Sequence, residues 1–468
     1  TDEQAMTSKW LYPGSAVGTK RPREYGFQQD RNVRFNLVPS IPESISADIL
    51  EHIFSSLSTE DRRACACSCK AWRSALSDPR AWKSLDIDFV ASSSSSRRPP
   101  QNLIRPDLFL RQRRFSEIES LKLKATHLQF TEHLVQALSE LRQVKTFALQ
   151  THPHVFLKTF ISSLSGFLGR LTSLSLDIGR SVLTTSSEVA LASILGRCTR
   201  LQQLSLMGRG CITEDAVSYR RIASLTTLRS LSIYSGLPMS FEDWLQKGKE
   251  NVLAMRDICT RVQTLRIPFD VMYTFLLSIH KIPLSSSSSG EKDLFPSYPL
   301  KHLQLDSDQQ NRYPNLAPLL SAMVTAFPEL EILRISSHHC HQKINRTQQC
   351  QKYHTYIGEL MPVSPVPIFP HLLALSVDDW GFTDDFANAL LKSCPQLHYV
   401  CLYILRRGPN PYDGLIQSRE TLSQRVPSAE IGSFDCDGKG QPFGNINRCI
   451  GLHRIGTCKL VGEAFPFG

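Results

Sequence analysis

The sequence has no uninterrupted run of about 18 or more apolar residues, so it predicts no membrane-spanning helix. A basic segment followed by an apolar one, the pattern of a secretory signal peptide, is absent from the first residues of a chain that begins at Thr1 rather than Met. The 13 cysteines are scattered and odd in number, whereas disulfide scaffolds are short and dense in cysteine. These features favour a reducing compartment, the cytoplasm or the nucleus, with most cysteines as small buried side chains.

Motifs for enzymatic chemistry are lacking as well. The chain has no Walker-type phosphate loop, no dinucleotide-binding glycine fingerprint and no G-x-S-x-G nucleophile elbow. Its net charge of +10 favours anionic partners in general, but the basic residues are spread out rather than gathered with aromatic residues into a nucleic-acid groove. We therefore predict a non-catalytic binding protein without cofactor or membrane association, and we do not expect a nucleic-acid partner.

Three short helices are predicted between residues 41 and 87. Apolar residues recur at helical spacing from Ile49 to Leu57 and form one face. Ser58, followed by acidic residues, is a helix start, and Asp78-Pro79 is another because Asp caps a helix and Pro suits its first position. Such a small unit has little core of its own, so its apolar face and two tryptophans indicate a surface that a partner protein covers.

The rest of the chain is organised by a repeat of the form L-x-x-L-x-L, in which other aliphatic residues replace leucine. Because alternate residues of a strand face opposite sides, the second and third aliphatic residues of each copy are predicted to point into a shared core. The first positions of ten successive copies are Ile118, Val144, Leu171, Leu201, Leu228, Val262, Leu300, Leu330, Leu372 and Leu397. Helical patterns lie between copies, for example at Val189–Leu195 and Phe386–Leu391.

This pattern predicts an α/β fold, a leucine-rich-repeat solenoid with a curved parallel sheet and outer helices, preceded by a small all-α three-helix segment. The low-complexity stretch Ser92–Ser96 marks a linker, and turn-rich sequence follows the last copy. The predicted segments are a disordered arm (1–39), a helical domain (40–90), a linker (91–116), the solenoid (117–405) and a C-terminal cap with an irregular tail (406–468).

The segment from Ile45 to Leu85 resembles an F-box. The matching motifs are Asp48-Ile49-Leu50, Ile53-Phe54, Leu57, Ser68-Cys69-Lys70-Ala71-Trp72 and Asp78-Pro79-Arg80-Ala81-Trp82. The family usually begins with Leu-Pro, where this chain has Ile45-Ser46, which puts the N-terminal contact geometry in doubt but not the helices. The repeats that follow resemble the leucine-rich class of the same family, in the same order.

The resemblance implies a substrate-recognition subunit of an SCF-type E3 ubiquitin ligase. In that family the F-box docks on a Skp-type adaptor, which links it to cullin and RING subunits, and the repeats hold the protein to be ubiquitinated. Carried over to this chain, the adaptor-binding residues are Ile49, Leu50, Ile53, Phe54, Leu57, Cys69, Trp72 and Trp82. Alternatively, some of these side chains only hold the three helices together.

Target binding is expected on the concave face of the sheet, at positions between the inward-pointing aliphatic residues. The candidates are Lys122, Lys124, Ser175, Asp177, Met207, Tyr234, Arg266, Gln304, Asp306 and Arg334. Their mixed chemistry names no ligand. Two other readings stay open: a repeat scaffold outside any ligase, with the helices as a cap, and a receptor whose basic concave pocket binds a small anionic ligand.

Two clusters contain residue types that bind zinc. Cys65, Cys67 and Cys69 alternate in a predicted helix, where residues two apart do not share a face, so we expect packing rather than metal. A second cluster comprises His338, His339, Cys340, His341, Cys350 and His354. Its spacing matches no standard zinc finger, and a polar loop without metal is the expectation.

Overall fold

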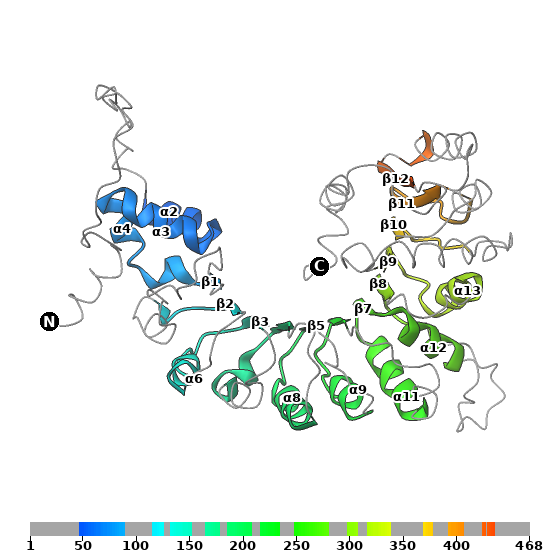
Figure 1. Ribbon diagram of the computed structural model, residues 1–468, viewed down its shortest axis with the longest axis horizontal. Helices are drawn as coiled ribbons and strands as arrows, with labels where there is room; N and C mark the ends of the chain where they lie inside the picture. Colours follow the sequence, from blue (N-terminus) through cyan, green and yellow to red (C-terminus); the bar gives the residue numbers. More distant parts are fainter. Residues whose placement is uncertain are drawn as a thin grey trace, which may run out of the picture.

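The computed structural model describes a helical unit at the N-terminal end and one long sheet that curves into an arch (Figure 1). The residues described are 46–88, 115–125, 132–151, 164–177, 185–207, 216–234, 248–279, 297–307, 316–337, 368–377, 392–406, 424–426 and 428–435. The predicted arm, the tail after residue 435, the helical pattern Phe386–Leu391 and the cluster His338–His354 lie outside these residues. None of the described helices combines the length and apolar character needed to cross a membrane.

The helical unit consists of α2 (Ala47–Ser56), α3 (Thr59–Ser68), α4 (Lys70–Ala75) and the short 3-10 helix η1 (Pro79–Trp82). Side-chain oxygens cap three of these starts, at Ser46, Ser58 and Asp78. Each accepts a backbone N–H that would otherwise have no partner in the first turn. The starts predicted at Ser58 and at Asp78-Pro79 are therefore confirmed.

The helix predicted after Ser58 is divided in two at Cys69. The backbone of Cys69 is extended, with φ −152° and ψ 163°, and its Sγ accepts the N–H of Trp72 at 3.4 Å as the cap of α4. The break lets α4 turn back, so that α3 and α4 pack on each other and α2 packs on α4.

In the described residues the sheet has twelve strands, all parallel and in chain order from β1 to β12. The strands are β1 (Ser84–Asp88), β2 (Ser120–Ala125), β3 (Thr146–Thr151), β4 (Ser173–Asp177), β5 (Gln203–Met207), β6 (Ser230–Tyr234), β7 (Thr264–Pro268), β8 (His302–Ser307), β9 (Ile332–Ser337), β10 (Ala374–Val377), β11 (Tyr399–Arg406) and β12 (Ser428–Asp435). Their register aligns the repeat residues: Leu121 pairs with Phe147, Phe147 with Leu174, and Leu174 with Leu204. The predicted solenoid is thus confirmed.

The sheet extends beyond the range 117–405 in both directions. Strand β1 pairs with β2 so that Leu85 lies opposite Leu121, and with Trp82 three residues earlier it forms a further copy of the repeat. At the other end β12 pairs with β11, with Ala429 opposite Val400 and buried Val426 three residues earlier. Both additions follow the repeat spacing with an aromatic or a small residue in place of leucine.

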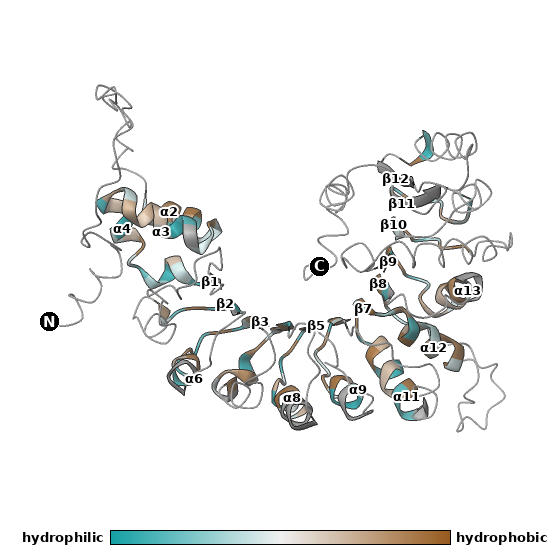
Figure 2. Ribbon diagram, viewed as in Figure 1, coloured by the Kyte–Doolittle hydropathy of each residue, from teal (hydrophilic) through white to brown (hydrophobic). Residues whose placement is uncertain are grey.

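Helices lie on the outer side of the arch and seal the core (Figure 1). They are α6 (Glu132–Ser139), α8 (Thr185–Arg197), α9 (Ala216–Ala223), α11 (Gly248–Cys259), α12 (Phe269–Ile279) and α13 (Leu316–Ala326). The pattern Val189–Leu195 lies within α8, as predicted. Figure 2 shows apolar residues on these helices and along the strands. The buried residues form one continuous core from Phe54 to Val426, and each buried leucine contributes about 1.5–3 kcal/mol.

Candidate interaction surfaces

Helix α2 carries two adjacent apolar stripes rather than one face. Leu50, Phe54 and Leu57 are spaced by four and three residues and turn inward, with Phe54 1% exposed and the other two half-buried. Ile49 and Ile53, four residues apart, point outward with 55% and 43% of their surface exposed. Among the described side chains, the only other exposed large apolar one is Ile368. An exposed pair on one helix face is the feature expected of a protein-binding surface.

Two of the predicted adaptor contacts are buried inside the chain. Phe54 packs edge-on against half-buried Trp72, with ring centroids 5.8 Å apart. Trp82 is 2% exposed, donates its Nε1–H to the Leu76 carbonyl at 2.6 Å and packs edge-on against Phe115 at 5.3 Å. Phe54 and Trp82 therefore hold the helices together and join them to the sheet, as the alternative interpretation of these residues allowed.

Arg62 joins the helical unit to the first strand and was not singled out from the sequence. Its guanidinium donates to the carbonyls of Ser55 and Leu57 at the end of α2, and to those of Ala81 in η1 and Ser84 at the start of β1, at 2.6–3.1 Å. The side chain is 2% exposed and lies over the Trp82 ring, and burial lowers its pKa. Arg62 lies at helical spacing from Thr59 and Ala66, which the structure shows to be buried, but neither residue marks a buried face in the sequence.

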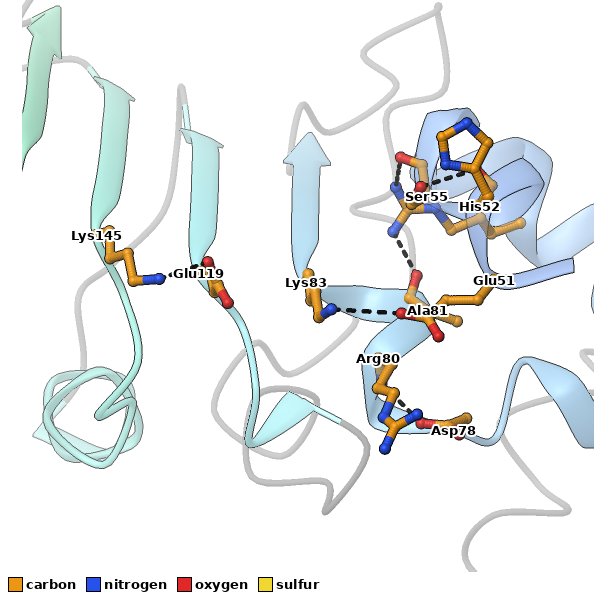
Figure 3. A network of polar contacts seen from close by, with 10 residues as sticks. Glu51, His52, Ser55, Asp78, Arg80, Ala81, Lys83, Glu119 and Lys145 are labelled. Carbon is orange, nitrogen blue, oxygen red and sulfur yellow. Dashed lines mark hydrogen bonds and ion pairs between the residues drawn. The ribbon is translucent and has the colours of Figure 1, made fainter. Parts of the chain in front are cut away.

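Two lysine–glutamate ion pairs lie beside this junction, at the edge of the sheet where the strands begin (Figure 3). Lys83 Nζ lies 3.4 Å from Glu51 Oε1 on α2, and Lys145 Nζ lies 2.8 Å from Glu119 Oε2. The hydrogen bond from Lys145 lowers the pKa of Glu119, and Lys83 adds a smaller attraction. Much of the surface of these side chains is exposed, so the ion pairs contribute little stability.

The cysteines of the helical unit do not form a metal cage. Cys65 is half-buried, whereas Cys67 and Cys69 are exposed, and no group of three potential ligands occurs within the described residues. Burial, and then the nearby Asp61, raise the pKa of the Cys65 thiol. Cys69, one of the predicted adaptor contacts, is exposed and lies beside half-buried Trp72.

The predicted target-binding residues fall in two adjacent rows across the concave face. In the first, Lys122 on β2 and Ser175 on β4 occupy the same register position as Arg266, Gln304 and Arg334 on β7 to β9. The second row contains Lys124, Asp177, Met207, Tyr234 and Asp306. Lys122 is exposed and pairs with Asp86, while Lys124, Asp177 and Met207 are half-buried.

The middle of this face is buried and polar. Arg266 Nε donates to Asp306 Oδ2 at 2.6 Å, and Gln304 Nε2 donates to Asp306 Oδ1 at 2.9 Å. Arg266, Gln304 and Asp306 are between 1% and 6% exposed. Ser205 and Ser232 lie in the first row between Ser175 and Arg266, are also buried and were not predicted, although they occupy the same position of the repeat.

The family comparison places an F-box-like match on residues 47–88, ending at the last residue of β1. A search of the curated proteins finds no match. Among solved structures 41 chains match. One belongs to the crystal structure of the Rad7 and Elc1 complex in yeast; it is 14% identical, with 86% of this chain and 94% of that chain covered and a TM-score of 0.44.

Proposed function

We propose that this chain, an F-box-like domain that runs directly into a leucine-rich-repeat solenoid, is the substrate-recognition subunit of an SCF-type E3 ubiquitin ligase. The F-box-like domain would bind a Skp-type adaptor and, through it, the cullin and RING subunits. The solenoid would hold the target protein. Such a subunit acts in the cytoplasm or the nucleus.

The exposed pair Ile49 and Ile53 is the observation that carries this proposal. Aliphatic and aromatic anchors at the centre of an interface supply most of its binding energy. Of the other residues proposed for this surface, Leu50, Leu57 and Trp72 are half-buried and Cys69 is exposed. Because Phe54 and Trp82 are buried, we propose that they support this surface from beneath rather than touch the adaptor.

The mechanism of such a subunit is proximity. Holding a target near a ubiquitin carrier raises the effective concentration of the reacting groups, and the transfer itself belongs to other subunits. Proximity requires a fixed geometry between the adaptor and the target. The continuous core from Phe54 into the strands, together with Arg62, supports such a geometry.

The double substitution Ile49→Glu/Ile53→Glu tests the adaptor surface. We expect it to weaken binding of a purified Skp-type adaptor at least roughly 100-fold, because two interface anchors of about 2 kcal/mol each would be lost. The measurement is isothermal titration calorimetry on the whole chain. Ile368→Glu, at a similarly exposed isoleucine before β10, is the matched control and should leave the affinity unchanged.

Wild-type-like adaptor binding by the double variant, or no binding by the wild type, would contradict the proposal and favour a scaffold outside any ligase. Affinity purification with mass spectrometry extends the test to target proteins. Proteins recovered with both the wild type and the Ile49→Glu/Ile53→Glu variant, while adaptor and cullin are lost from the variant, are the candidate targets.

A further inference from the structure

Arg334 is a cation on the concave face that has no partner among the residues the structure describes. It lies on β9 with its side chain half-buried, and its Nε is shielded from solvent. It forms no hydrogen bond or ion pair with any described residue, and that Nε has no acceptor. Arginine stays protonated at any physiological pH, and a buried donor left without an acceptor costs about 1–3 kcal/mol. An anion bound at the accessible part of this half-buried guanidinium would compensate its charge.

The residues next to Arg334 leave its positive charge unbalanced among the described residues of the concave face. In register, Gln304 on β8 and Ser376 on β10 flank it, and both are buried. The other arginine of the row, Arg266, is already paired with Asp306 at 2.6 Å. One positive charge is therefore balanced internally, and the charge of Arg334 remains for a ligand.

We propose that the concave face from β6 to β9 binds an acidic segment of a protein, with one carboxylate of that segment on Arg334. The inference rests on the proposed role of the solenoid in holding a target and names the chemistry of that target. A guanidinium presents parallel N–H groups that match the two oxygens of a carboxylate.

The charge balance favours a carboxylate over a phosphate. A phosphorylated side chain carries about −1.5 to −2 charge and is best held by a cluster of arginines. Of the two described arginines in this row, only Arg334 has no ion-pair partner among the described residues. The carboxylate of Asp306 on the neighbouring strand would repel a dianion more strongly than a monoanion.

A second polar group indicates where the rest of the segment lies. Ser232 on β6 is buried and its Oγ has no hydrogen-bond partner. Three strand spacings of about 4.8 Å separate β6 from β9, so Ser232 and Arg334 are roughly 14 Å apart, the length of about four extended residues. An extended segment crossing the strands would place its acid on Arg334 and its backbone over the small polar residue at Ser232.

Panning a random 12-residue phage-displayed peptide library on the whole chain tests this proposal. We expect the recovered peptides to share Asp or Glu at one fixed position, and panning on Arg334→Met to lose that preference. The matched control is Arg229→Met, which removes the same charge at an exposed arginine just before β6. Panning on this variant should retain the preference for an acid. Circular dichroism and adaptor binding, measured on each preparation, separate this test from that of the proposed function.

A double-substitution cycle on one recovered peptide then measures the contact by fluorescence anisotropy. We expect Glu→Gln in the peptide and Arg334→Met in the protein each to weaken binding about 10-fold or more, with no further loss when combined. Additive losses, an equal loss with Arg229→Met, or recovered peptides without a fixed acid would overturn the proposal. If a peptide with phosphoserine in place of the acid binds more tightly, the site prefers a phosphate to a carboxylate. That result would overturn the proposal as well.

Discussion

At the scale of single residues, Arg62 shows how much one buried charge can organise. Its four donated hydrogen bonds join carbonyls at the end of α2 to carbonyls of η1 and the start of β1. Hydrogen bonds to a charged group contribute about 1.5–3 kcal/mol each and are costly to remove when buried. The position of the helical unit relative to the sheet therefore depends strongly on this side chain.

Arg62→Met should lower the free energy of unfolding by at least about 3 kcal/mol, because one buried and three partly buried hydrogen bonds to a charged donor are lost at once. Urea unfolding followed by circular dichroism gives the value. Arg80→Met, at an exposed arginine of η1, is the control and should change stability by less than about 0.5 kcal/mol. Equal effects of the two substitutions would mean that Arg62 does not join the helices to the sheet.

At the scale of secondary-structure elements, the short helices depend on their caps. Helix α3 contains ten residues with few apolar side chains, and its hydroxyl cap Ser58 both accepts from Asp61 N at 3.1 Å and donates to Asp61 Oδ2 at 2.7 Å. Isolated helices of this length are marginal in water, so the cap decides where α3 begins. The orientation of Cys65 and the neighbouring residues follows from that start.

Ser58→Ala should destabilise the chain by about 1 kcal/mol, the usual cost of losing a hydroxyl cap. Thermal or urea unfolding measures the change. Ser74→Ala, at an exposed position inside α4, makes the same chemical change without removing a cap and should alter stability by less than about 0.5 kcal/mol. A larger effect at Ser74 than at Ser58 would contradict the assigned role of the cap.

At the scale of the whole molecule, the arch is a one-dimensional stack. The strands pair only with their neighbours in chain order, and the outer helices contact adjacent helices. Stability in such an array is a sum of repeat terms and nearest-neighbour interfaces, so a local defect has a local effect. The F-box-like end and the concave centre can therefore be altered separately.

Leu204→Ala, in the middle of β5, should cost about 2–5 kcal/mol because it removes a buried side chain from the shared core. Hydrogen exchange with mass spectrometry should show faster exchange centred on β4 to β6, with the F-box-like helices unaffected. Gln203→Ala, on the exposed neighbour in the same strand, is the control. Uniformly faster exchange along the chain would show that the molecule unfolds as one unit instead.

The repeat was predictable because its signal is local and recurs. Aliphatic residues at fixed spacing appear ten times in the sequence, and their register in the sheet follows from that spacing. The end copies were missed because Trp82 and Ala429 replace leucine. The buried position of Arg62 was missed because a single arginine in a polar helix looks like a surface residue. No repeated pattern in the sequence distinguishes it.

By itself, the sequence determined the order of elements, the inward-facing aliphatic rows and the starts of the capped helices, since periodicity and capping act over a few residues. Only the tertiary structure decided which apolar residues of α2 stay exposed, because Phe54 and Ile53 differ by one position and packing against Trp72 separates them. It also decided which concave charges are paired. Arg266 pairs with Asp306, 40 residues away on the adjacent strand, while Arg334 has no partner among the described residues. This distinction exists only once the strands lie side by side.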